Sequence, residues 1–137
     1  MRILALDHGT VRIGVAVSDE LKMIARPLEF IPAEPFTEFL DRLKFLIKEQ
    51  QADLIVVGMP RNMDGTYGEA AAKVRAFIAA LKDVILVPIR TWDERLTTVS
   101  ASKALRSGGT KSSGQRERID AAAAAVLLQG YLDSLAP

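Results

Sequence analysis

The sequence predicts an α/β fold in which a mixed five-stranded sheet is covered by helices on both faces. Two observations lead to this prediction. Three short segments with strand character follow one another at the start of the chain, and two later strands alternate with amphipathic helices. Consecutive strands pair as an antiparallel meander, whereas strands joined through helices run parallel. The expected strand order across the sheet is therefore 3-2-1-4-5.

The first two strands enclose a carboxylate. Residues 3–6 form an apolar run that is too short for a helix and is typical of a buried strand. Asp7 follows it, and Gly9 permits a tight turn and the close approach of a ligand. In the next strand, residues 12–18, Gly14 leaves room beside Asp7. This pattern predicts an acidic site at the end of the first strand. The alternative is that Asp7 is only a turn residue before Gly9.

The middle of the chain supplies a third strand, a helix and a fourth strand. Residues 23–31 are expected to form an edge strand, because Pro27 cannot donate to a hydrogen-bond ladder. Residues 36–50 carry apolar side chains at helical spacing along one face. Residues 52–58 form a continuous apolar run that indicates a buried strand, and residues 59–66 form a loop dense in turn-forming residues.

A second helix and a fifth strand follow. The helix is expected over residues 68–82, and the strand over residues 84–89, where Pro88 indicates another edge. The packed face of that helix is predicted to consist of Ala71, Val74, Phe77, Ile78 and Leu81.

The last part of the chain is predicted to be two helices joined by a polar loop. The first spans about residues 98–107 and stops at two glycines. Residues 108–118 are small, polar and basic, as in a loop. The final helix is expected from residue 119 to residue 135, with Asp120 in its first turn. Its apolar stripe is predicted to be Ile119, Ala122, Ala123, Val126, Leu127 and Tyr131.

Length and composition narrow the classes of protein. We expect one domain over residues 1–137. The absence of cysteine excludes disulfides and thiolate metal sites, and the lack of an export signal or a long apolar run favours the cytoplasm with no membrane partner. The net charge is only +1, but residues 90–118 hold seven Lys or Arg against three acids. That excess suits a phosphate backbone, although a solvated surface is the alternative.

Three acidic positions lie where ligands are expected. Asp7 and the pair Asp93-Glu94 follow predicted strands, and Asp120 opens the last helix. Strand ends of this kind meet at one edge of a sheet. Clustered carboxylates repel each other unless cations join them, and Mg²⁺ and Mn²⁺ prefer oxygen ligands. Two such ions, about 4 Å apart, activate water and stabilise the leaving oxygen of a phosphodiester. The alternatives are a helix-dipole role for Asp120 and a surface ion pair for Glu94.

Four motifs together resemble the YqgF/RuvX family of bacterial RNase H-like nucleases over essentially the whole chain. They are Asp7-x-Gly9-x-x-Arg12-x-Gly14, Gly58-x-Pro60, Asp93-Glu94-Arg95-Leu96-Thr97-Thr98 and Asp120-Ala121-x-Ala123-Ala124. The resemblance implies an RNase H-like fold and a metal-dependent nuclease that trims the 5′ end of the precursor of 16S ribosomal RNA during ribosome biogenesis. The sequence departs from the family pattern in one respect. Family members usually carry a dense run of basic residues just before the last acid, whereas residues 111–118 of this chain hold only a few.

The same resemblance implies roles for individual residues. Asp7, Glu94 and Asp120 would be the catalytic acids that bind Mg²⁺ or Mn²⁺. Asp93 is the alternative to Glu94, because adjacent strand residues point to opposite faces. The substrate would be structured pre-16S rRNA or branched DNA, and ribosomal particles are a further expected partner. The residues expected to contact nucleic acid are Arg12, Arg61, Arg95, Lys111, Arg116 and Arg118.

Three other functions compete with this one. Asp7-x-Gly9-Thr10 also resembles the first phosphate loop of actin-like ATPases and sugar kinases, which need a second domain and an adenosine-binding segment. A Holliday junction resolvase would need two sites related by a dimer axis. A non-catalytic RNA-binding factor for ribosome assembly would bind RNA equally well without Asp7.

Overall fold

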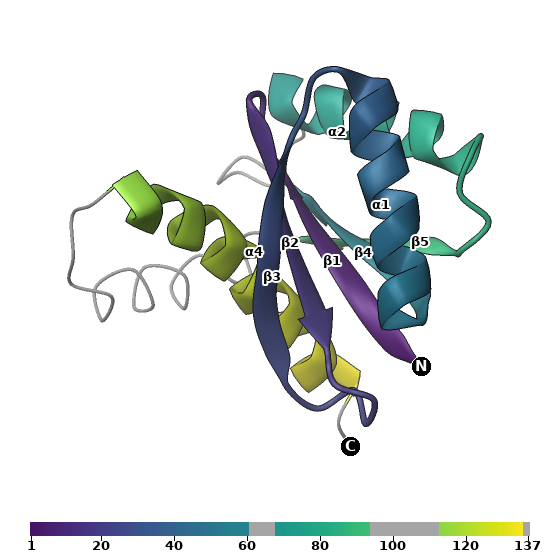
Figure 1. The fold of residues 1–137 in the computed structure, drawn as a ribbon, viewed down its shortest axis with the longest axis vertical. Coiled ribbons are helices and arrows are strands. Elements are labelled where there is room, and N and C mark those ends of the chain that lie inside the picture. Colours follow the sequence, from purple (N-terminus) through teal and green to yellow (C-terminus); the bar gives the residue numbers. More distant parts are fainter. Residues whose placement is uncertain (61–67, 94–112, 136–137) are drawn as a thin grey trace.

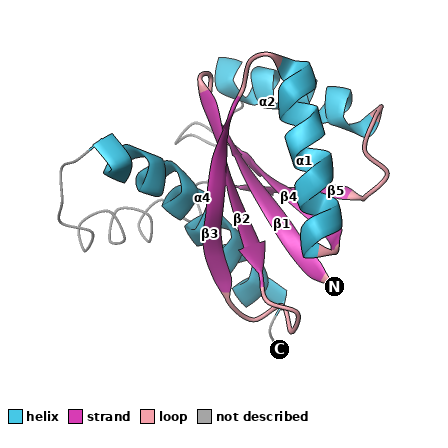
Figure 2. Cartoon of the chain, in the orientation of Figure 1, coloured by secondary structure: helices cyan, strands magenta, loops and turns pink. Residues whose placement is uncertain are grey.

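The computed structural model describes residues 1–60, 68–93 and 113–135, with side chains described from residue 122 onward in the last range (Figures 1 and 2). The predicted loop after residue 60 and the predicted helix at residues 98–107 therefore lie outside the described residues. No helix in these ranges is long and apolar enough to cross a membrane. The elements are β1 (Arg2–His8), β2 (Arg12–Ser18), β3 (Ala25–Pro32), α1 (Phe36–Gln50), β4 (Ala52–Met59), α2 (Glu69–Lys82), β5 (Ile89–Asp93) and α4 (Ser113–Leu135).

The five strands form one sheet in the order β3-β2-β1-β4-β5, which confirms the predicted order. β1, β2 and β3 pair antiparallel, whereas β4 runs parallel to β1 and β5 runs parallel to β4. β3 lies at the edge, as Pro27 predicted. Pro27 pairs with Ala16 beside a register shift between Val15 and Ala16, which is where a ladder tolerates proline.

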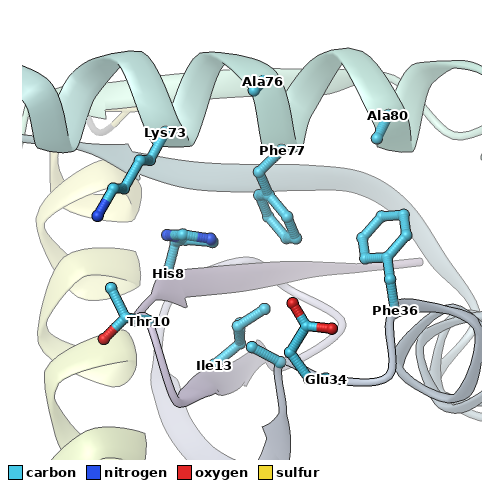
Figure 3. Close-up of a pocket in the computed structure, with 11 residues that line it drawn as sticks. His8, Thr10, Ile13, Glu34, Phe36, Lys73, Ala76, Phe77 and Ala80 are labelled. Carbon is cyan, nitrogen blue, oxygen red and sulfur yellow. The ribbon is translucent and has the colours of Figure 1, made fainter.

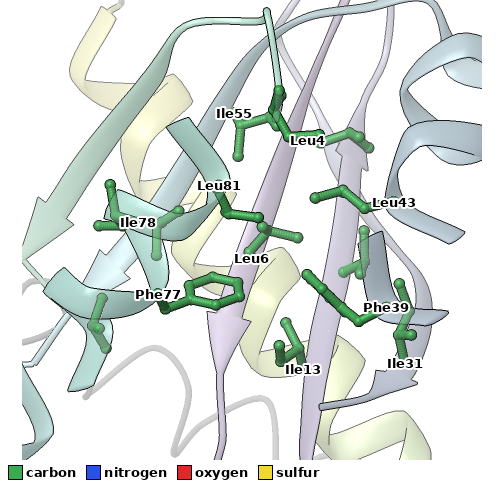
Figure 4. Close-up of a cluster of buried hydrophobic side chains, with 14 of the residues drawn as sticks. Leu4, Leu6, Ile13, Ile31, Phe39, Leu43, Ile55, Phe77, Ile78 and Leu81 are labelled. Atoms are coloured by element: carbon green, nitrogen blue, oxygen red, sulfur yellow. The ribbon is translucent and has the colours of Figure 1, made fainter. Parts of the chain in front are cut away.

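Helices α1 and α2 cover one face of the sheet, and the larger core lies beneath them (Figure 4). Leu4 and Leu6 of β1 point into this core, where they meet Phe39 of α1 and Phe77 and Leu81 of α2. All five predicted core residues of α2 are buried there. The prediction succeeded because a spacing of three and four residues marks one side of a helix.

Helix α4 covers the opposite face, where a second core lies (Figure 1). Ile3 and Ala5 of β1 point to this side, since strand residues alternate between faces. The buried α4 residues are Ala124, Leu127, Leu128, Tyr131 and Leu132. The predicted stripe was therefore right only for Leu127 and Tyr131 among the residues whose burial is described, because Ala124, Leu128 and Leu132 are buried where Ala122, Ala123 and Val126 were expected.

The predicted position of the fifth strand was wrong. The fifth strand is Ile89–Asp93 rather than residues 84–89. The apolar residues before it close helix α2 instead, because the Ile85 N–H donates to the Leu81 carbonyl at 2.8 Å and Ile85 is buried. Pro88 contributes only its carbonyl to the ladder, which accepts from the Ile55 N–H at 2.9 Å. This use of proline leaves no donor missing.

The last helix begins at Ser113 rather than at residue 119. Asp120 is therefore about two turns inside α4 and not in its first turn. Residues 113–118, which the sequence indicated as loop, belong to the helix, so Arg116 and Arg118 are helical positions.

The β1–β2 turn depends on Gly9. A Cβ atom at this position would lie 2.5 Å from the Arg12 carbonyl oxygen, which no neighbouring side chain could relieve by moving. We therefore expect Gly9→Ala to lower the free energy of unfolding by about 1–3 kcal/mol, the usual cost of forcing a methyl group into filled space. Urea unfolding measures this change. Thr10→Ala, an exposed change in the same turn, is the control, and an equal loss in both variants would contradict the assignment.

The β2–β3 turn depends on a carboxylate. Oδ1 of Asp19 accepts the N–H groups of Ile24 at 3.1 Å and Met23 at 2.8 Å. These bonds hold the pKa of Asp19 below its ordinary value of 3.8. The stability they contribute is then fully present above that value and is lost as the pH falls through the lower pKa of the folded state. We expect Asp19→Asn to flatten the acid side of the plot of unfolding free energy against pH, and an unchanged plot would refute this.

Candidate functional site

Asp7 lies inside β1, one residue before its end, and not after the strand as predicted. It is half-buried. Leu6 points to the α1 and α2 side and His8 packs on Phe77 of α2, so alternation directs Asp7 to the side that α4 covers. The predicted carboxylate is thus placed on one defined face at the carboxyl end of the central strand.

Glycines flank Asp7 on both neighbouring strands. Gly14 of β2 is its cross-strand partner. Gly58 of β4 lies one residue beyond the paired residues Leu6 and Val57, and it shares the α4 side with Val56. Because glycine has no side chain, neither neighbouring strand places side-chain atoms beside the carboxylate. The prediction that Gly14 sits beside Asp7 is confirmed, and Gly58 extends the same feature to the other side.

Arg12 stands on the same face as Asp7. It precedes Gly14 by two residues, which is the strand spacing for side chains on one face. Its guanidinium carbon lies 5.4 Å from the ring centroid of Phe30, the β3 partner of Gly14. A cation–π contact of this kind limits the directions that the guanidinium takes. The structure therefore brings the predicted phosphate-binding arginine to the Asp7 side of the sheet.

The end of β5 is attached to α4 by aromatic side chains. Trp92 pairs with Gly58 in the sheet, and its ring centroid lies 5.6 Å from that of Tyr131 in α4. One guanidinium nitrogen of Arg90 donates to the Tyr131 hydroxyl at 3.3 Å. The Trp92 indole N–H is buried and has no hydrogen-bond partner among the described residues. Trp92 therefore joins the end of β5 to α4.

Asp93 and Asp7 belong to opposite faces. Asp93 is the last residue of β5 and pairs with Met59. Trp92 packs on the α4 side, whereas Ile89 packs on the α1 and α2 side. Asp93 lies four residues after Ile89, so strand alternation gives it the same side as Ile89. The carboxylate of Asp93 is therefore directed away from the α4 side on which Asp7 lies.

The other predicted site residues are described only in part. Glu94, Arg61, Arg95 and Lys111 lie outside the described residues. Asp120, Arg116 and Arg118 are backbone positions of α4 whose side chains are not described. Within the described part of the chain, no three His, Asp or Glu side chains gather closely enough to hold a metal ion.

His8 and Lys73 form a feature that the sequence did not indicate. The His8 ring centroid is 4.7 Å from that of Phe77, and burial together with the nearby Lys73 ammonium lowers the pKa of His8 below 6.5. The imidazole is therefore mainly neutral at neutral pH. A cavity of about 370 Å³ runs from Asp7 past these two residues to Pro60, so the ends of β1 and β4 do meet. No sequence pattern connects a strand-end histidine with a distant helix lysine.

Comparison with known proteins agrees with this arrangement. The family model described as "RuvX: Holliday junction resolvase" matches residues 1–134. The chain belongs to the RuvX family. A protein of Desulforamulus reducens named "Putative pre-16S rRNA nuclease" is 48% identical over 134 residues, which make up 98% of each chain. A Clostridium novyi protein of the same name is 43% identical over 135 residues, covering 98% of this chain and all of the relative.

Solved structures show the fold of the RuvX-family chain to be that of RNase H-like resolvases. Thermus thermophilus RuvC superposes with a TM-score of 0.59 at 14% identity, covering 98% of this chain and 95% of RuvC. The fowlpox virus resolvase, solved with its Holliday junction substrate, gives a TM-score of 0.59 at 12% identity over the whole of both chains. The RNase H-like fold implied by the motifs is thereby confirmed.

Proposed function

We propose that this protein is a divalent-metal-dependent ribonuclease that hydrolyses phosphodiester bonds at the 5′ end of pre-16S rRNA. The observation that carries the proposal is the half-buried Asp7, set between two glycines at the carboxyl edge of the sheet, with Arg12 on the same face. Close relatives bear the name of a pre-16S rRNA nuclease, which supports RNA as the substrate.

The residues present suit Mg²⁺ or Mn²⁺ better than a softer metal. Asp7 offers carboxylate oxygens, the chain contains no cysteine, and its one histidine points to the other face of the sheet. Asp7, Glu94 and Asp120 would hold the ions. When bound in a pair, such ions supply an activated water and neutralise charge on the leaving oxygen.

We prefer Glu94 to Asp93 as the third acid. Asp93 is directed to the face opposite Asp7, because it lies an even number of residues after Ile89 in β5 and therefore points to the same side as Ile89. Asp120 precedes Ala124 by four residues, the spacing at which helix positions share a side, and Ala124 is fully buried against the sheet. This spacing supports a role for Asp120 on the Asp7 side.

The chain's own residues would orient the substrate. Arg12 can hold a phosphate oxygen with paired N–H donors, and its contact with Phe30 limits the directions that the guanidinium takes. Gly14 and Gly58 allow an RNA backbone to approach the Asp7 carboxylate closely. Arg61, Arg95, Lys111, Arg116 and Arg118 are proposed to supply further phosphate contacts.

The proposal includes a single RNase H-like nuclease domain over residues 1–137, a cytoplasmic location where precursor rRNA is found, and ribosomal particles as partners. A second candidate is cleavage of branched DNA, because the matching family model is described as a Holliday junction resolvase and the fowlpox virus resolvase was solved with Holliday junction DNA.

The first test is cleavage of a 5′-extended 16S rRNA precursor with Mg²⁺, with Mn²⁺ and with EDTA. We expect cutting only with metal, and we expect Asp7→Asn to lower its rate at least about a hundredfold, the scale of losing one electrostatic contact to a transition state. A four-way DNA junction is the second substrate. Cutting of the junction alone would move the assignment to a resolvase, and unchanged RNA binding with no cutting would leave a non-catalytic binding factor.

The choice between the adjacent acids is tested by two single variants. We expect Glu94→Gln to abolish cleavage and Asp93→Asn to retain most of it, because the Asp93 carboxylate is directed away from Asp7. The rate is measured at saturating metal, and circular dichroism checks that both variants fold. Loss of activity in Asp93→Asn alone would reverse the assignment.

A further inference from the structure

A second cavity lies between the β1–β2 turn and helices α1 and α2 (Figure 3). Its volume is about 430 Å³, which is within the range of small-ligand sites. His8, Thr10 and Lys73 line both this cavity and the one that begins at Asp7. The two cavities are thus neighbours at the end of β1.

The two ends of this cavity differ in charge. Lys73 and His8 stand at one end, and Glu34 and Phe36 stand at the other (Figure 3). In the part of the chain whose side chains are described, neither the Glu34 carboxylate nor the Lys73 ammonium has a hydrogen-bond or ion-pair partner. A ligand that enters therefore meets a carboxylate and an ammonium, both of which are exposed to solvent.

The wall between these ends is aromatic. The rings of Phe36 and Phe77 both line the cavity, with centroids 6.3 Å apart at 73°. Both rings are held by packing on Phe39, at 5.9 Å from Phe36 and 5.6 Å from Phe77. Nucleobases extruded from a strand are bound by such surfaces, through their flat faces, and are read through hydrogen bonds on their edges.

We propose that this cavity binds an unpaired guanosine nucleotide of the substrate, with guanine against the half-buried ring of Phe36, its Watson–Crick edge at Glu34 and its phosphate at Lys73. Guanine is the base whose edge presents two adjacent donors, N1–H and the N2 amino group, which match the two oxygens of a carboxylate. Adenine, cytosine and uracil each present an acceptor at one of these positions. The inference rests on the proposed function in one respect, since it names RNA as the source of the nucleotide.

The test uses His8 as a reporter. It is the only histidine in the chain, so its imidazole NMR signals are unambiguous. The four nucleoside 5′-monophosphates are titrated at constant neutral pH. We expect guanosine 5′-monophosphate to shift the His8 signals saturably and to bind about tenfold more tightly than adenosine 5′-monophosphate, as one good bidentate base contact allows.

Three substitutions of exposed residues test the base contact and the phosphate contact separately. Glu34→Gln should remove the preference for guanine, because an amide offers one acceptor and one donor where the two guanine donors need two acceptors. Lys73→Gln should weaken all four nucleotides similarly. Glu38→Gln, on the first turn of α1 and outside this cavity, is the matched control and should change nothing. Equal binding of all four nucleotides, or a preference that survives in Glu34→Gln, would overturn the proposal.

A second arm distinguishes substrate from free nucleotide. A single-stranded RNA tetranucleotide with one guanosine, and its adenosine counterpart, are titrated in EDTA so that no metal-dependent cleavage occurs. The guanosine tetranucleotide should displace guanosine 5′-monophosphate from the His8 site more effectively than its counterpart. Binding of the free nucleotide alone would refute a substrate subsite. Because neither arm depends on catalysis, failure here is distinct from failure of the cleavage assay.

Discussion

Burial of β1 on both of its faces is the constraint on which the rest of the structure depends. Ile3, Leu4, Ala5 and Leu6 are all inaccessible to solvent or nearly so, and they alternate between the core under α1 and α2 and the core under α4. A shift of one residue would exchange these faces and move Asp7 toward an apolar core, where a charge is costly. The register of the central strand therefore decides where every strand-end side chain lies.

That register separates two neighbouring residues into different environments. Asp7 is directed to the α4 side, between glycines and near Arg12. His8 is directed to the other side, against Phe77 and near Lys73, where burial keeps its imidazole mainly neutral. One strand end thus presents a carboxylate on one face and, on the other, a histidine that lines a cavity of about 430 Å³. Both sides are formed by the sheet and by the helices that cover it.

Small residues set how closely α4 approaches the sheet. Ala124 of the helix and Ala5 and Ala16 of the strands are fully buried in the same cluster. Side chains of this size allow close contact between backbones, and Leu127 and Leu128 fill the space that remains. The contact between Trp92 and Tyr131 joins the end of β5 to the same helix. The helix that carries Asp120 and the strand that precedes Glu94 are therefore held together by packing at their described ends.

The sequence by itself determined the elements whose local pattern is strong. The bounds of α1 and β2, the packed face of α2 and the edge position of Pro27 all followed from periodicity or from the chemistry of one residue. The family motifs indicated the RNase H-like fold and nominated Asp7 and Arg12, which the structure places on one face. The roles of Glu94 and Asp120 remain predictions.

Tertiary structure decided what local pattern could not. The run from Val84 to Val87 has the composition of a strand, yet the Ile85 N–H donates to the end of α2. A strand forms only where a neighbouring strand can hydrogen-bond with it, and β4 does so only from Pro88 onward. The consecutive alanines in α4 do not indicate by themselves which side of the helix is packed, so contact with the sheet decides it. The separation of Asp93 from Asp7, and the cavity between His8 and Lys73, depend on which residues pair across strands and on where helices pack. Contacts between residues distant in sequence leave no local trace, and for this reason only the folded chain reveals them.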